Sequence, residues 1–291
     1  MALVHLCYRQ FWTLCIEYAH IERNTGRNVK QQFNKVDSNS AMLCGVAFTN
    51  EVKVQRDVGR QSATFTSNDH FVVPVDVTEL RIFAVGASGG SGNGFGVLLN
   101  NGGEGGTAVS NIKVSPGETL EIFVGVRGKD GSLPDGGQGG GSASGFEGGT
   151  AAPGKAGGGG GGGGASGAIR VRGEEVLVVA GGGGGGSGVG NGGLIGRGGA
   201  GGSFGISGRG IAPGKVRHGC GTRGGSGPID SDFGSGGGGG GLYGGGAGSD
   251  IDLKSSGGGA GGTGTLAGGV SSDGGGQDNG IVLISFDQSR D

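Results

Sequence analysis

Apolar and polar residues alternate with a period of two along much of the chain from about residue 46 onward. The segments that alternate in this way, or that cluster β-branched and aromatic residues, are EVKVQRD, SATFTS and HFVVPVDVTELRIFAV. Both features are typical of half-buried β-strands. Residues 79–85 carry apolar side chains on both sides of the predicted strand, so we expect both of its faces to be covered.

Two hairpins and a final strand are predicted further along the chain. In NIKVSPGETLEIFVGV, Pro116-Gly117 makes a turn between two strands that contribute to the core. The core positions expected in this hairpin are Ile112, Val114, Leu120, Ile122, Val124 and Val126. A second hairpin joins AIRV to EVLVVA around Arg172-Gly173-Glu174, and GIVLISF at 280–286 forms the last strand. The pattern therefore predicts an all-β domain.

The first residues follow a different period. Across residues 2–21 polar side chains recur every four positions opposite an apolar stripe, which predicts a short amphipathic helix. This helix could dock on the domain, pair with a partner or lie on a membrane surface. Alternatively, the segment precedes the true start of the protein, because Met42 is the only other methionine and the composition changes sharply after it. We therefore divide the chain into an N-terminal helix and linker, 1–45, and a glycine-rich domain, 46–291.

Glycine dominates three segments between the strands, at roughly 86–106, 128–167 and 181–279. They show no strict period of three, which excludes collagen, and no solenoid repeat. An isolated glycine run stays disordered, because fixing each residue costs about 1–2 kcal/mol and a hydrogen bond returns only about 0.5–1.5 kcal/mol. Runs anchored by strands at both ends could instead pack as polyproline II helices that hydrogen-bond laterally. We favour this bundle over a flexible tether.

Single larger residues interrupt the glycine segments. Leu194, Ile195, Phe204, Leu242 and Tyr243 would sit at the rim of the bundle and pack it onto the sheet. A random tether rarely carries residues of the buried type. These interruptions therefore support the bundle.

Composition and charge exclude several classes of function. The chain has 83 glycines in 291 residues, 5% aromatic residues and a net charge of -2 without long charged runs. We therefore expect no nucleic-acid partner, since such partners need a concentrated basic field or stacking platforms. No apolar run is long enough for a transmembrane segment, and the N-terminus does not match a secretory signal. The cysteines are not paired at zinc-site spacing, although Cys44 could bridge to Cys220 in an oxidising compartment.

The order of glycine runs and strands carries a resemblance. GGGGGGGGASGAIRVRGEEVLVVAGGGGGG (157–186), followed by FGSGGGGGGLYGGGAGSD (233–250), resembles the glycine-rich extracellular domain of the anaplastic lymphoma kinase and leukocyte tyrosine kinase receptors. FVVPVDVTELRIFAVGASGGSGNG and VSPGETLEIFVG look like glycine-rich modules of bacterial surface proteins and phage tail-fibre adhesins. The resemblance covers about residues 62–287. It implies a jelly-roll-like β-sandwich with an inserted bundle of glycine polyproline II helices, at an extracellular, cell or virion surface. The chain has no kinase domain, so receptor signalling is not implied.

Motifs that could carry chemistry are weak. Gly181, Gly183 and Gly186 formally match a dinucleotide fingerprint, but the following residues suit no helix and supply no acidic ligand. His218 and Cys220 lie on a glycine loop that would not hold a nucleophile and its base in register. GKDGSLPDGG and SDIDLK loosely resemble calcium loops, although solvated turns explain them better. We therefore predict no enzyme activity, cofactor or metal.

Three functions remain in competition. The first is a surface recognition module that binds a protein or glycan through loops on a stiff scaffold. The second is a structural wall, coat or fibre component, which would assemble with itself as a homo-oligomer. The third, ice binding, expects a tripeptide regularity that is missing. The candidate binding residues are large residues that interrupt the glycine segments, namely Phe95, Phe146, Phe204, Phe233, Leu242 and Tyr243. The alternative role for each is packing at the rim of the bundle, and we favour that role for Leu242 and Tyr243.

Overall fold

The computed structural model describes most of residues 55–287, all within one unit that spans Thr49–Asp291. The gaps inside this range are 58–59, 95–96, 143–144, 156, 189–197, 200, 202–213, 216–220, 228–233, 249, 252–254, 257–258, 260–261, 263, 265–268 and 277. The predicted N-terminal helix and the boundary at residues 45 and 46 lie outside the described residues. Every regular element within them is a β-strand, as the alternating pattern predicted.

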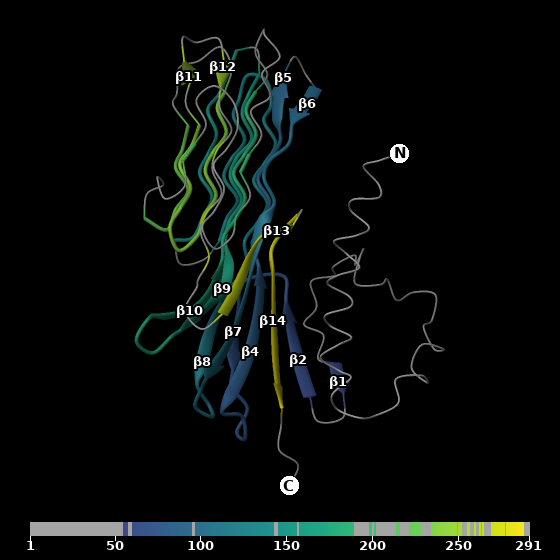
Figure 1. Ribbon diagram of the computed structural model, residues 1–291, viewed down its shortest axis with the longest axis vertical. Helices are drawn as coiled ribbons and strands as arrows, with labels where there is room; N and C mark the ends of the chain where they lie inside the picture. Colours follow the sequence, from purple (N-terminus) through teal and green to yellow (C-terminus); the bar gives the residue numbers. More distant parts are fainter. Residues whose placement is uncertain are drawn as a thin grey trace, which may run out of the picture. The chain divides into compact units, whose positions relative to one another are not determined.

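Two antiparallel sheets form the lower half of Figure 1. The larger sheet has the order β1-β2-β14-β4-β7-β13, and the smaller has the order β10-β9-β8-β3. The strands of the larger sheet are β1 (Gln55–Asp57), β2 (Arg60–Phe65), β4 (Glu79–Val85), β7 (Gly105–Lys113), β13 (Gly269–Gly276) and β14 (Ile281–Asp287). Those of the smaller sheet are β3 (Asp69–Val72), β8 (Thr119–Phe123), β9 (Ser166–Arg170) and β10 (Glu175–Ala180). We call these two sheets the two-sheet region.

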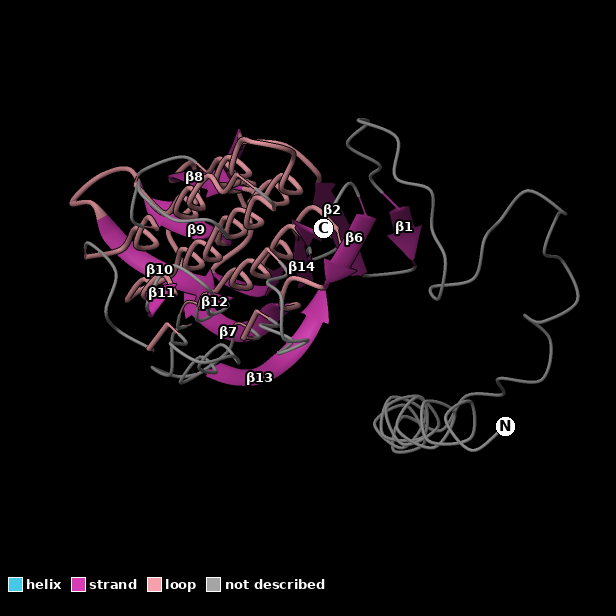
Figure 2. Ribbon diagram, turned by 90° about the horizontal axis from the view of Figure 1, so that it is seen from above, coloured by secondary structure: helices cyan, strands magenta, loops and turns pink. Residues whose placement is uncertain are grey.

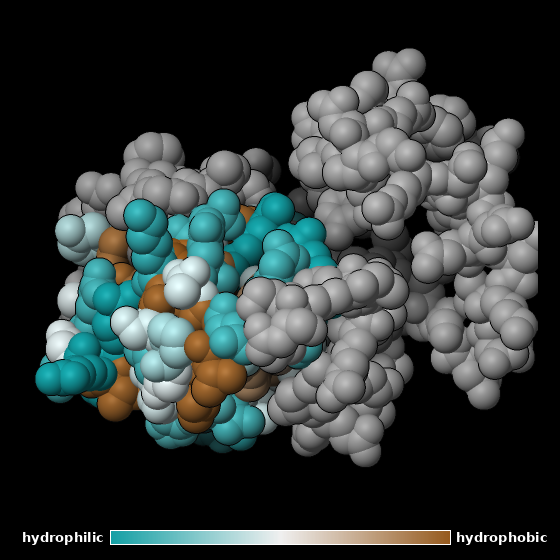
Figure 3. Space-filling view, turned by 90° about the horizontal axis from the view of Figure 1, so that it is seen from below, coloured by the Kyte–Doolittle hydropathy of each residue, from teal (hydrophilic) through white to brown (hydrophobic). Residues whose placement is uncertain are grey.

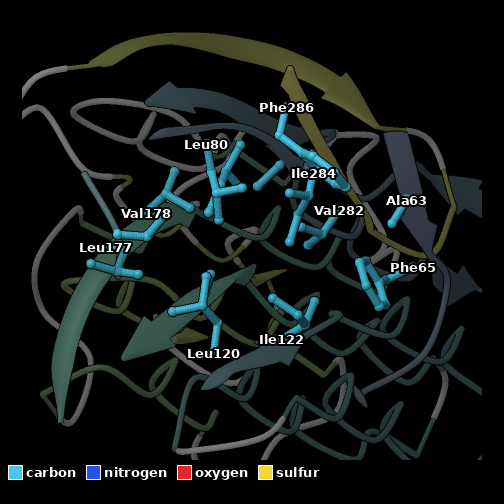
Figure 4. Close-up of a cluster of buried hydrophobic side chains, with 14 of the residues drawn as sticks. Ala63, Phe65, Leu80, Leu120, Ile122, Leu177, Val178, Val282, Ile284 and Phe286 are labelled. Carbon is cyan, nitrogen blue, oxygen red and sulfur yellow. The ribbon is translucent and has the colours of Figure 1, made fainter. Parts of the chain in front are cut away.

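The two sheets share one hydrophobic core (Figure 4). The larger sheet contributes every second side chain of β4 and β14, such as Leu80, Ile82 and Ile284, and all three are inaccessible to solvent. The smaller sheet contributes Leu120 and Ile122 of β8, which are equally buried. Burying a side chain of this size stabilises the fold by about 1.5–3 kcal/mol. The arrangement fits the predicted β-sandwich.

The prediction of a hairpin around Pro116-Gly117 is wrong. β7 pairs with β4 in the larger sheet, whereas β8 pairs with β3 and β9 in the smaller one. Gly117, with φ at 77°, turns the chain from one sheet to the other, and its N–H donates to the carbonyl of Val73. The same local pattern serves a hairpin or a crossing between sheets, because both need a tight turn between half-buried strands. Val126 is 49% exposed instead of joining the core.

The second predicted hairpin is confirmed. β9 and β10 pair directly, and the turn contains Gly173 and Glu174, both with positive φ. A bulge at Leu177 shifts the register, so that Leu177 and Val178 both pack into the core. The final strand β14 is also confirmed, and it lies in the middle of the larger sheet between β2 and β4.

Glycine segments run from the two-sheet region to two short hairpins at the far end of Figure 1. These hairpins are β5 (Gly92–Gly94) with β6 (Val97–Asn100), and β11 (Asp250–Ile251) with β12 (Ser255–Ser256). Viewed end-on, the segments form an array of small coils packed side by side (Figure 2). We call the described residues within 86–104, 125–164, 181–248 and 259–264 the glycine region.

Backbone hydrogen bonds link each glycine segment to a given neighbouring segment at every third residue. Gly160 and Gly163 donate to the carbonyls of Gly186 and Gly183, with N···O distances of 2.7 Å. The intervening residues donate elsewhere: Gly161 donates to Lys129 and Gly162 donates to Gly149. Successive N–H groups therefore point to three different neighbouring segments, and the pattern repeats after three residues.

The segment 157–164 lies at the centre of this arrangement. It donates to segments 149–152, 181–188 and 126–129, and it accepts from segments 87–93, 137–140 and 234–240. All eight of its residues are buried. A Cβ atom placed on Gly162 would lie 1.9 Å from the carbonyl oxygen of Gly238, and one on Gly161 would lie 2.0 Å from that of Gln138. Side chains are excluded here because backbone occupies the space on every side.

Candidate functional site

The outer segments of the glycine region keep their side chains on the solvent side. Residues 126–132 and 135–141 run antiparallel, with the N–H of Lys129 donating to Gln138 and that of Ser132 donating to Asp135. The paired positions are again three residues apart, so these four polar side chains recur along one exposed strip. Glycines at 128, 131, 137 and 140 face inward and are buried. The outer pair of segments is thus a surface on which polar groups are held at regular spacing.

A pocket of about 450 Å³ opens to solvent on this surface. It lies between the paired segments and the neighbouring residues 150–153. Polar side chains supply most of its lining, namely Lys129, Asp130, Ser132, Asp135, Gln138 and Thr150. Gly136, Gly137, Ala151 and Pro153 complete it. The pocket is within the size range of small-molecule sites.

Hydrogen bonds fix two of the polar groups that line the pocket. Asp130 accepts at one carboxylate oxygen from the Arg127 guanidinium at 2.6 Å and from the Ser91 N–H at 2.7 Å. Thr150 is held through its backbone, since its N–H donates to the Ser226 hydroxyl at 3.3 Å and its carbonyl accepts from Gly227 at 2.9 Å. The Asp130 carboxylate and the Thr150 backbone are thus held without a ligand, which lowers the entropy cost of binding one.

Glycines make the closest approach of backbone beneath the pocket. A Cβ atom on Gly137 would lie 2.0 Å from the carbonyl oxygen of Lys129, and one on Gly136 would lie 2.4 Å from that of Ala151. The segments that carry the pocket residues can therefore approach one another only because these positions lack side chains. The glycine region thus sets the position of the lining groups.

Phe146 does not serve as an exposed contact residue. It is 3% exposed, and its ring stacks on Phe123 of β8 with centroids 4.7 Å apart and an interplanar angle of 6°. Ala165, Ile169 and Val179 complete a second hydrophobic cluster around the two rings. Phe146 therefore joins the glycine region to the outer face of the smaller sheet, the packing role that was the alternative for each candidate.

Tyr243 is the candidate that the structure leaves accessible, with 51% of its surface exposed in a bend of the chain. The neighbouring Leu242 is half-buried. Phe95, Phe204 and Phe233 lie outside the described residues, as do Leu194 and Ile195. The structure thus brings none of the described candidates into the pocket.

Sequence reasoning assigned the pocket residues to a solvated turn or a loose calcium loop. Lys129, Asp130 and Asp135 all belong to GKDGSLPDGG. The missed signal is the spacing of Lys129 and Ser132, and of Asp135 and Gln138, three residues apart among glycines. In a backbone with a three-residue repeat this spacing places side chains on one face. Within the part of the chain that the structure describes, no three His, Cys, Asp or Glu side chains group as a metal site.

The dinucleotide fingerprint has a structural role in this fold. Gly183 and Gly186 donate their N–H groups to the carbonyls of Ala87 and Gly90. These donors are therefore engaged in the glycine region, and Gly181 to Gly188 are buried. Cys44, His218 and Cys220 lie outside the described residues.

Other exposed apolar groups lie in the two-sheet region. Val72, Val75 and Val171 are 60%, 74% and 48% exposed. Seen from the end opposite the glycine region, hydrophobic surface occurs as separate patches among hydrophilic residues (Figure 3). Scattered apolar side chains of this kind are normal on protein surfaces. No described residues form a helix with the length and hydropathy that crossing a bilayer requires.

No protein-family model matches the chain, and a search of curated proteins found no significant match.

Proposed function

We propose that this protein is a non-enzymatic recognition module that acts at an extracellular, cell or virion surface and binds a protein or glycan. The observation that carries this proposal is the polar pocket, whose lining groups are held by hydrogen-bonded glycine segments. Binding sites are commonly displayed on segments that a rigid scaffold positions. The surface location rests on the resemblance to receptor and adhesin modules.

In this proposal the glycine segments are polyproline II helices inserted into a jelly-roll-like sandwich. A polyproline II helix has three residues per turn and makes no internal hydrogen bonds, so its N–H groups point outward in three directions. The three-residue repeat of the bonds between segments supports this assignment. Glycine suits such helices because neighbouring backbones must approach closely.

A structural role in a wall, coat or fibre is the second candidate. Because each glycine segment is hydrogen-bonded to several neighbours, the glycine region would be rigid, as a structural component under mechanical load requires. A structural part should self-associate, whereas a recognition module should capture a ligand as a single copy or a defined homo-oligomer.

Binding and assembly measurements on the full chain separate the two candidates. We would probe immobilised glycans and host surface proteins, and measure the mass of the protein by light scattering across a concentration series. The proposal expects saturable binding and a fixed mass. Open-ended growth in mass without any saturable binding would overturn it.

A further inference from the structure

We infer that the pocket between segments 126–141 and 150–153 binds a neutral saccharide. This inference rests on the proposed recognition function and names the class of its ligand. Three features of the pocket support it: its hydrogen-bonding groups, its charge balance and its size.

The polar groups of the pocket match the hydroxyls of a sugar. Asp130 and Asp135 are acceptors, Lys129 is a donor, and the Gln138 amide both donates and accepts. Ser132 and Thr150 add hydroxyls that can take either role. Sugar hydroxyls also donate and accept, so adjacent hydroxyls pair with groups of both kinds. A ligand with acceptors alone, such as a phosphate, would offer no donor to the Asp135 carboxylate and would be repelled by its charge.

Charge balance favours a neutral sugar over an acidic one. Asp130 is paired with the Arg127 guanidinium at 2.6 Å. Lys129 and Asp135 then contribute one charge of each sign to the lining. Binding of sialic acid or sulfate requires uncompensated cations, usually arginine. A neutral saccharide loses nothing to repulsion by Asp135.

Size and residue type favour a saccharide over a protein at this place. A stable protein interface covers about 800 Å² on each partner and relies on Trp, Tyr and Arg anchors. The pocket is an open hollow of about 450 Å³ and has no aromatic residue in its lining. The aliphatic C–H groups of a sugar ring can pack on the half-buried Pro153, whereas Ala151 is 5% exposed and adds little surface.

The test uses the full chain on an array of neutral, sialylated and sulfated oligosaccharides, followed by calorimetric titration with the best neutral sugar. Asp135→Asn should weaken binding about tenfold, because it replaces one carboxylate acceptor with an NH2 donor and removes the charge. Gln138→Ala should weaken it about fivefold, because it removes the amide. The matched control is Asp76→Asn, the same change at an exposed turn between β3 and β4. It should leave the affinity unchanged. Thermal unfolding of each variant shows that the fold is intact.

The outcomes separate this inference from the function on which it rests. Neutral-sugar binding that Asp135→Asn and Gln138→Ala weaken supports both. Sugar binding unaffected by either variant overturns the pocket as its site and leaves a recognition function. Capture of sialylated or sulfated sugars, or of a surface protein, overturns the ligand class but not the recognition function. Absence of all binding together with open-ended assembly overturns both.

Discussion

The two-sheet region and the glycine region are stabilised by opposite means. In the first, interlocking side chains such as Leu80, Leu120 and Ile284 fill the space between two sheets. In the second, segments such as 157–164 pack backbone against backbone, and their hydrogen bonds repeat every three residues. Side chains are the source of stability in one region and the main obstacle to packing in the other.

The difference predicts how each region tolerates substitution. A side-chain core can adjust rotamers around a smaller or similar residue, so conservative changes are tolerated there. At the centre of the glycine region the neighbouring atoms are carbonyl oxygens of other segments, which cannot rotate away. Adding one methyl group there should therefore cost more than removing one from the core of the sheets.

Gly162→Ala should have the largest effect. Its Cβ would lie 1.9 Å from the Gly238 carbonyl oxygen, so at least two segments must move apart. We expect a loss of more than about 5 kcal/mol, beyond the range of about 1–3 kcal/mol typical of an overpacked core, because the contacting atoms belong to the backbone. Urea unfolding followed by circular dichroism measures the loss, and hydrogen exchange shows whether protection of 157–164 and 181–188 disappears.

Gly141→Ala is the matched control for this substitution. Gly141 is exposed, and a Cβ atom placed on it would meet nothing within 4 Å. Alanine should stabilise the protein slightly, by about 0.4–1 kcal/mol, because it restricts the unfolded chain. Equal destabilisation by both variants would contradict the view that close backbone packing distinguishes Gly162.

Phe146→Ala should separate the two regions. Phe146 stacks on Phe123 and closes the second hydrophobic cluster, through which apolar side chains join the glycine region to the smaller sheet. Truncating a buried phenylalanine costs about 3–5 kcal/mol. We expect calorimetry to show two resolved transitions in place of one. A variant as stable as the parent would show that the remaining contacts, such as the bond from the Gly125 N–H to the Ser166 hydroxyl, suffice to join the regions.

The sequence predicted most strands of the two-sheet region but only some of their partners, and it did not predict the four strands of the two short hairpins. The alternation in β4 and β14 identified both as strands, because each buries every second residue. Pairing of β7 with β4, and of β8 with β3 and β9, could not be read from the chain. A turn such as Ser115 to Glu118 fixes a change of direction but not the sheet that the next strand joins.

The sequence predicted that the glycine segments pack together, but it did not predict which segments are neighbours. Anchoring by strands at both ends suggested that the glycine runs pack together. Which segments lie next to 157–164 depends on contacts distant in sequence, such as those with 87–93 and 234–240. Glycine has no side chain to mark an inward or outward position, so local sequence holds no record of these neighbours. β13, a glycine-rich strand, was missed for the same reason.

The pocket was missed because its residues lie in two separate segments. Lys129 and Asp135 could be placed on one outer face once a three-residue repeat was assumed. Thr150 and Pro153 join them through bonds such as Ala151 N–H to the Gly137 carbonyl. Phe146 was predicted with two possible roles, because an aromatic residue among glycines looks the same whether it packs inward or outward.

Ile284→Val tests the tolerance of the two-sheet region. Ile284 is fully buried in the middle of β14, and valine keeps the β-branched shape while removing one methyl group. The loss should be about 0.5–1.5 kcal/mol, well below that of Gly162→Ala, although both positions are equally buried. Chemical unfolding of the two variants under the same conditions makes the comparison. A larger loss for Ile284→Val would contradict the proposed contrast between the regions.

Arg223→Gln should have the smallest effect, and it asks whether side chains stabilise the surface of the glycine region. Arg223 pairs with Glu147 at 3.0 Å, but its side chain is 64% exposed, so water and salt screen the attraction. Exposed pairs of this kind contribute about 0.2–1 kcal/mol, and we expect the loss to fall to nearly nothing in 1 M salt. The measurement is the difference in unfolding free energy between the parent and Arg223→Gln at low and high salt. A loss above about 2 kcal/mol that persists in salt would mean that this ion pair, rather than backbone packing, fixes segment 221–227 on its neighbours.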